Sequence, residues 1–398
     1  MQSPRRPSYL RFAWPRPRTS SREEAMAQPA QDEIPEPDRV EGAPHPRETL
    51  ALFGHERAED EFLAAFTMGR LHHGWLITGP LGVGKATLAW RIARFLLATP
   101  EGGGLFDAPP PASLEVPADH PVARRMAALS EGRIFLLRRA WDEKAKRLKT
   151  QITVEEVRRM KAFFALSAAD GGRRVAIVDP ADEMNVSAAN ALLKLLEEPP
   201  EGVTILLVCH QPSRLLPTIR SRCRELRLSA LSPEDMARAL TAAGVEAGDP
   251  QALAELAGGS AGEAIRVANL EGVKLYAALV GLLSTLPRLD RAKLVALADA
   301  ASGKGAEPQF ELMLTLIDLF LARVARAGTL RLLPPEAVPG EGDLIARLAP
   351  DARAARLWAD LAQTLGNRAR RGRAVNLDPA ALLMDMVLRI DETAAQLA

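Results

Sequence analysis

Residues 75–86 read WLITGPLGVGKA, a short apolar run followed by a glycine-rich turn. An apolar run of this length between glycines is typical of a buried strand. The turn after it, from Gly79 to Lys85, has the G-x-x-x-x-G-K spacing of a phosphate-binding loop, and a helical pattern follows it. Such glycines let backbone N–H groups surround the phosphates, and the lysine reaches the β- and γ-phosphates. The stretch therefore predicts a P-loop in an α/β fold.

The residue after the lysine departs from this pattern. A hydrolysing P-loop has serine or threonine there, because the hydroxyl ligates Mg²⁺. This chain has Ala86, and Thr87 comes one residue late, where one helical step turns the side chain by about 100°. Magnesium binding is therefore not expected, while ATP binding without hydrolysis stays open. The candidate nucleotide-binding residues of this degenerate loop are Gly79, Gly82, Gly84, Lys85 and Thr87.

The acidic motif that accompanies a P-loop also lacks one of its residues. The predicted strand Val175–Val178 ends in Asp179, the place of the magnesium-organising Walker B aspartate. Hydrolysing relatives continue with a glutamate that polarises the attacking water, but this chain has Pro180. Asp182 and Glu183 are interpreted as the start of the next helix, where acidic residues favour the helix dipole. No catalytic residue in cis is predicted.

Further apolar runs organise the first half of the chain. Two more strands are expected, at Ile134–Leu137 and Thr204–Cys209. Helical patterns lie between the strands, at residues 56–68, 86–98, 153–166 and 187–197. Strands that alternate with helices predict a parallel sheet covered on both faces, a RecA-like α/β class. Residues 99–121 are predicted to form a surface loop, and strand patterns stop after about residue 230.

Four parts are predicted along the chain. Residues 1–48 are rich in arginine and then in proline and acids, which indicates a disordered, dispensable leader; a transit peptide or a start at Met26 are alternatives. The helical residues 271–398 have wide Leu/Ala faces, which indicate contacts with other subunits. The predicted parts are a leader at 1–48, an α/β domain at 49–229, a small helical lid at 230–270 and a helical collar for oligomerisation at 271–398.

Composition narrows the functional classes. The formal net charge is +1, so contact with nucleic acid must be local or pass through partners. Cys209 and Cys223 are the two cysteines, too few for a disulfide framework or a zinc site, which fits a reducing cytoplasm. No run reaches 18 apolar residues, so no membrane span is expected and the predicted location is cytoplasmic.

Two further motifs carry a family resemblance. Residues 190–200 read NALLKLLEEPP, and Ser221-Arg222-Cys223 follows about twenty residues later. With the P-loop and the spacing from Asp179, they resemble the clamp-loader subunits of bacterial DNA polymerase III, a branch of the AAA+ P-loop ATPases. The resemblance covers about residues 49–270 by motif, and the helical remainder agrees in length and type.

Within that family, the chain is similar to the delta-prime group rather than to the motors, gamma and tau. Motors resemble one another in a complete Walker A, an Asp-Glu Walker B and a sensor-two arginine after Gly-Ser. This chain has Ala86, Pro180 and, at the sensor position, Gly262. Many family members carry a four-cysteine zinc module after the P-loop helix, but the loop at 99–121 has no cysteine, so no zinc is expected.

The resemblance implies a partner set and a role. The partners would be the gamma/tau motor subunits and the delta subunit, in a circular five-subunit assembly. Through that assembly the chain would support the loading of the sliding clamp onto primed DNA in chromosomal replication. It would be a non-hydrolysing stator, a subunit of the DNA polymerase III holoenzyme without ATPase activity of its own.

Arg222 is the predicted active residue of this stator. A planar, permanently charged guanidinium can reach across an interface and stabilise a transferring γ-phosphoryl group, as an arginine finger in trans. The alternative is a surface arginine at the end of the sheet. Cys209 and His210 are interpreted as vestigial or structural, and His72-His73 lack a third metal ligand nearby.

Three other functions remain as hypotheses. The chain could be a motor that tolerates Ala86 and Pro180, which predicts magnesium-dependent ATP turnover. It could be another AAA+ ATPase, such as a Holliday-junction motor or a replication initiator, which would not explain residues 190–200. It could also be an adaptor unrelated to replication, which would leave the whole motif set unexplained.

Overall fold

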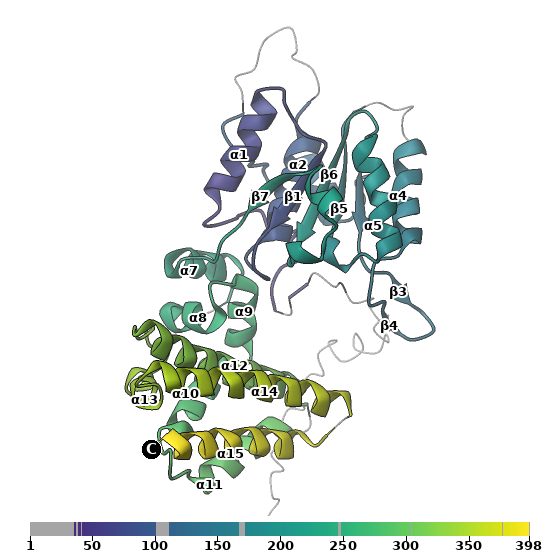
Figure 1. Ribbon diagram of the computed structural model, residues 1–398. Coiled ribbons are helices and arrows are strands. Elements are labelled where there is room, and N and C mark those ends of the chain that lie inside the picture. The colour runs from purple at the N-terminus through teal and green to yellow at the C-terminus, as the bar shows by residue number, and fades with distance from the viewer. Residues whose placement is uncertain are drawn as a thin grey trace, which may run out of the picture. The chain divides into compact units, whose positions relative to one another are not determined.

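The computed structural model describes residues 36, 39–40, 42–100, 111–166, 172–245, 248–303, 305–375 and 377–397 (Figure 1). All elements below belong to one compact unit, Pro37–Ala398. Most of the predicted leader, and residues 101–110 of the predicted loop at 99–121, lie outside the described residues.

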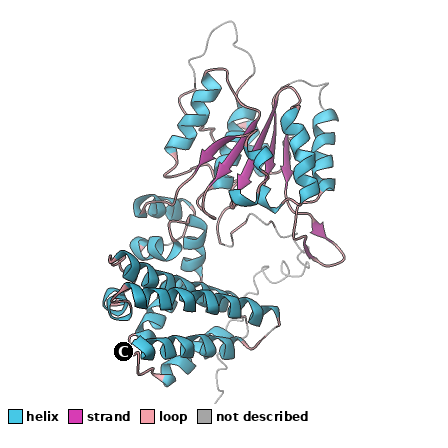
Figure 2. Ribbon diagram, in the orientation of Figure 1, coloured by secondary structure: helices cyan, strands magenta, loops and turns pink. Residues whose placement is uncertain are grey.

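Five parallel strands form the central sheet, in the order β2-β5-β6-β1-β7 (Figure 2). The predicted α/β class with a parallel sheet is confirmed. All residues of β1, β5 and β6 are buried, as expected for strands covered on both faces. The strands are β1 Gly74–Thr78, β2 Ile134–Leu137, β5 Arg174–Val178, β6 Val203–Cys209 and β7 Arg224–Arg227.

Helices cover both faces of this sheet, and alternate strand residues point to opposite sides. Trp75 and Ile77 pack with α1 (Glu56–Thr67), α2 (Lys85–Ala98) and α3 (Pro121–Ala127). Leu76 instead joins the core formed with α4 (Val154–Leu166) and α5 (Val186–Glu197). Figure 1 shows α1 and α2 on one side of the strands and α4 and α5 on the other.

Short elements connect the sheet and its helices. β3 and β4 form a two-stranded antiparallel hairpin between β2 and α4. The sequence pattern places Asp182 and Glu183 at the start of the next helix, and that helix is a short 3₁₀-helix, η1, and not α5. They lie in η1, and α5 starts later because Asn185 is its N-cap and accepts the N–H of Ala188. The short elements are β3 Trp141–Asp142, β4 Arg147–Leu148, η1 Ala181–Glu183, η2 Pro212–Arg214 and α6 Pro217–Arg220.

Helices make up the described chain after residue 230. Their buried side chains, from Leu231 to Ala394, form one hydrophobic cluster. The predicted division between lid and collar near residue 270 stays a prediction, because this core runs through both parts. The helices are α7 Pro233–Ala242, α8 Pro250–Ala257, α9 Ala261–Asn269, α10 Gly272–Leu283, α11 Arg291–Ser302, α12 Glu307–Leu330, α13 Glu341–Leu348, α14 Ala352–Ala374 and α15 Pro379–Leu397.

A buried polar cluster centred on Glu341 joins four of these helices. The Glu341 carboxylate, fully buried at the start of α13, lies 2.6 Å from Arg323 Nε of α12 and accepts the Tyr276 hydroxyl of α10 at 2.6 Å. It also accepts the N–H of Ala337, and Arg323 contacts Glu255 of α8 at 2.9 Å. Burial and the charge of Glu341 raise the pKa of Tyr276, so this hydroxyl keeps its proton and donates.

Within the part of the chain that the structure describes, no helix is both long and apolar enough to cross a membrane.

Candidate functional site

The predicted P-loop lies between the end of β1 and the start of α2. Gly84 is the N-cap of α2, with a φ of +106° that favours glycine. Gly79 has a φ of +145°, and a Cβ atom there would lie 2.5 Å from the carbonyl oxygen of Leu228. The loop therefore needs glycine at both positions, for backbone conformation and for close packing against the chain after β7.

Lys85 folds back onto the loop that precedes it. Its ammonium donates to the carbonyl oxygen of Gly79 at 2.8 Å and to that of Pro80. The residue is 3% exposed, and this burial lowers its pKa to about 8, although the nearby Asp179 acts in the opposite direction. A phosphate at this loop would have to draw the ammonium away from those two carbonyl groups.

The Walker B position lies close to this lysine but has lost the acid beside it. Asp179 follows β5, is 4% exposed, and donates its N–H to the carbonyl oxygen of Leu137 in the neighbouring strand. Pro180, the next residue, can neither bind nor orient water through its side chain. Asp182, two residues on, accepts the N–H groups of His210 and Gln211 at 2.9 and 3.2 Å, so it holds the segment after β6 in place.

Cys209 and His210 have the properties of structural residues. Burial raises the pKa of the Cys209 thiol to about 12, and burial lowers the pKa of His210 to about 4. At neutral pH the thiol is therefore protonated and the imidazole uncharged. Neither group is then a strong nucleophile or a cation for a phosphate, in agreement with the structural interpretation of both residues.

The position of the missing sensor-two arginine lies directly against the P-loop. Gly262, near the start of α9, donates its N–H to the carbonyl oxygen of Gly82 at 3.0 Å. A Cβ atom on Gly82 would lie 2.3 Å from the hydroxyl of Ser260, the N-cap of α9. A Cβ atom on Gly262 would lie 3.3 Å from the Cα atom of Gly82, so a side chain at this position would start in tight contact with the loop.

Arg222 lies at the opposite end of the sheet from this loop. It precedes β7, which runs parallel to β1 with Trp75 opposite Arg224 and Thr78 opposite Arg227. The P-loop follows the carboxyl end of β1, whereas Arg222 is placed near its amino end. Five strand residues at roughly 3.3 Å each separate the two ends by about 17 Å. Arg222 therefore cannot serve the phosphate site of its own chain.

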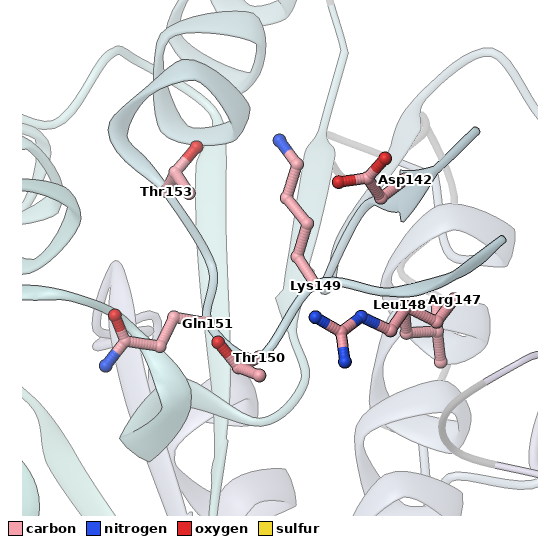
Figure 3. A pocket seen from close by; sticks show the side chains of 7 residues that line it. All are labelled: Asp142, Arg147, Leu148, Lys149, Thr150, Gln151 and Thr153. Carbon is pink, nitrogen blue, oxygen red and sulfur yellow. The ribbon is translucent and has the colours of Figure 1, made fainter. Parts of the chain in front are cut away.

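The β3–β4 hairpin carries a pocket that the sequence patterns did not indicate (Figure 3). Its volume is about 260 Å³ and none of its lining residues belongs to the P-loop. Two cationic side chains contribute to it; one of them, Lys149, lies 3.7 Å from Glu156 of α4. Two-residue strands give no periodic signal, so only the charge density of this segment could have indicated it. The lining residues are Asp142, Arg147, Leu148, Lys149, Thr150, Gln151 and Thr153.

No candidate metal-binding site is present among the described residues. They contain no group of three or more His, Cys, Asp or Glu side chains arranged to hold a metal ion. The His72 and His73 rings stack on each other, and each has a ring nitrogen within hydrogen-bond distance of a backbone carbonyl oxygen. Both histidines therefore have partners within the fold.

Comparisons with known proteins agree with the motif resemblance. Residues 54–232 match the family described as DNA polymerase III, delta subunit. The chain is 40% identical over 192 residues to the DNA polymerase III subunit delta' of Pseudomonas aeruginosa, covering 47% of this chain and 53% of that protein. It is 29% identical over 336 residues to the Escherichia coli delta' subunit, covering 83% and 92%.

The chain is also similar to gamma and tau subunits of DNA polymerase III. The DNA polymerase III subunit gamma of Buchnera aphidicola is 28% identical over 192 residues, covering 48% of this chain and 47% of that protein. The chain thus spans about half the length of the first relatives it matches, and most of the E. coli delta' subunit.

Proposed function

This chain is a relative of the delta' subunits of DNA polymerase III, and on that premise we propose that it is a non-hydrolysing stator of a clamp loader. Its partners are the gamma/tau motor subunits and the delta subunit. Together they place a sliding clamp on primed DNA in the cytoplasm. The chain contributes Arg222 to the ATP site of a neighbouring motor, as an arginine finger in trans.

One observation carries this proposal: Arg222 and the P-loop lie at opposite ends of the same sheet. An arginine whose backbone lies about 17 Å along the sheet from its own phosphate loop, at roughly 3.3 Å per strand residue, is placed to reach a phosphate in another subunit. Its side chain is 38% exposed, so it is available at the surface. A guanidinium is planar and positively charged, so it can donate two parallel N–H bonds to the negatively charged oxygens of a γ-phosphoryl group.

The degenerate ATP site supports the proposal that the chain does not hydrolyse ATP itself. Ala86 cannot ligate magnesium and Pro180 cannot orient water, while Lys85 is already satisfied by backbone carbonyl groups. Similarity to gamma and tau subunits keeps an ATP-hydrolysing motor as the second candidate, since Lys85 and Asp179 are retained. ATP could still bind without being hydrolysed.

We predict that the purified chain does not turn over ATP in the presence of magnesium. Losing one group that stabilises the transition state costs about 10²–10³ in rate, and this chain lacks both the magnesium ligand and the water-orienting acid. The measurement is phosphate release by the isolated chain, with a purified motor subunit assayed in parallel. Turnover comparable to the motor, abolished by Lys85→Ala, would instead identify the chain as a motor.

A further inference from the structure

The segment at residues 190–200 contains an acidic pair, Glu197-Glu198, to which the proposed function gives no role. Glu197 is the last residue of α5, and its carboxylate lies 3.0 Å from Nη2 of Arg222. The other terminal nitrogen of Arg222, Nη1, donates to the carbonyl oxygen of Thr218 at 3.1 Å. Both terminal nitrogens of the proposed finger therefore have partners within the chain.

The packing beneath this ion pair fixes the two segments side by side. A Cβ atom on Gly74 would lie 2.9 Å from the side chain of Leu196 and 3.3 Å from the carbonyl oxygen of Arg222. His73 Nε2 lies 2.9 Å from the carbonyl oxygen of Leu196, so the end of α5 is also tied to the start of β1. Leu196 is 2% exposed. The buried core thus brings Glu197 and Arg222 together.

Glu197 competes with a phosphate group for the guanidinium of Arg222. An arginine recognises an anion best through two parallel N–H groups, and here the two terminal nitrogens are occupied in cis. Glu197 sits at a helix C-terminus, where a carboxylate is disfavoured by the helix dipole and gains from a neighbouring cation. The side chains are 38% and 44% exposed, so solvent weakens the contact and makes it easy to reverse.

We propose that Glu197 is a positioning residue that holds Arg222 in cis until the phosphate of a neighbouring subunit's ATP displaces it. This inference rests on the proposed trans role of Arg222. Before the neighbouring ATP site closes, Glu197 then lowers the fraction of time for which Arg222 is free to bind the phosphate. Exposed ion pairs of this kind shift such an equilibrium by up to about fivefold.

The test is ATP turnover by the reconstituted complex, with motor subunits whose own Ser-Arg-Cys arginines are changed to alanine. The measured rate then reports the site that Arg222 faces. Without clamp and DNA, Glu197→Gln should raise the rate about two- to fivefold. Glu198→Gln is the matched control, because it removes the same charge one residue away and should leave the rate unchanged. At saturating clamp and primed DNA, Glu197→Gln should match the wild type, because the closed site already holds the finger.

Combining the substitutions separates this inference from the proposed function. Glu197→Gln should have no effect on a chain that also carries Arg222→Ala, a dependence that a merely structural role of Glu197 would not produce. If Arg222→Ala lowers the rate while Glu197→Gln equals the wild type or reduces the rate, the holding role is wrong and the trans finger stands. If Arg222→Ala itself changes nothing, both proposals are wrong.

Discussion

Replacing Glu341 with alanine should lower the free energy of unfolding of the helical residues 231–397 by about 3–5 kcal/mol, because a buried cation then loses its main partner. Arg323 would keep the carbonyl oxygen of Pro335 and the partly exposed Glu255 as partners, but no buried carboxylate. The Tyr276 hydroxyl and the Ala337 N–H would lose their acceptor as well. Buried donors without a partner are costly, so the loss exceeds that of a surface ion pair.

The measurement is urea unfolding followed by helical circular dichroism, comparing the wild type with Glu341→Ala. Asp343→Ala is the matched control, because this acid lies on the same turn of α13 but is exposed, and its loss should cost under about 1 kcal/mol. Equal losses for the two substitutions would show that the buried cluster does not hold the helices together.

Three of the four strands that sequence patterns predicted are buried throughout, whereas the fourth, β2 at the edge of the sheet, is mostly only partly buried. The runs in β1, β5 and β6 are continuous and apolar because helices cover both faces of the sheet. The P-loop could be recognised because its glycines meet strict conformational demands, as the positive φ angles of Gly79 and Gly84 show. Residue type and spacing in the sequence are enough to reveal these local requirements.

Other features depend on contacts between distant residues and left no local pattern. β7 has one buried residue, Leu226, among three exposed charged ones, because it lies at the edge of the sheet. Asp182 resembled a helix-starting acid, yet it binds backbone N–H groups that lie 28 and 29 residues further along the chain. The meeting of Glu197 with Arg222 depends on packing around Gly74, which only the folded chain reveals.

Arg222→Ala should lower ATP turnover at the one site that depends on this chain by about 10³–10⁵, the usual contribution of an arginine finger. Total turnover of the complex should fall less, because motor sites with other fingers remain. Folding and assembly should be unaffected, since a partly exposed arginine contributes little to stability. Arg222→Lys should fail as well, because an ammonium cannot reproduce two parallel N–H bonds to phosphate.

Arg220→Ala provides the matched control for this substitution. Arg220 is the last residue of α6 and is exposed. Replacing it with alanine removes the same charge, two residues from Arg222. Its loss should leave turnover and assembly unchanged. A similar fall in turnover for Arg220→Ala and Arg222→Ala would point to a general effect of surface charge and not to a finger.

Steady-state ATP turnover by the full complex, at saturating clamp and primed DNA, tests the stator account most directly. The complex is assembled from motor subunits, the delta subunit and either the wild-type chain or the Arg222→Ala variant, and clamp loading is followed in the same samples. The account predicts a normally assembled complex with reduced turnover and reduced loading in the Arg222→Ala sample. Unchanged turnover and loading would contradict it and leave this chain without a trans-acting arginine.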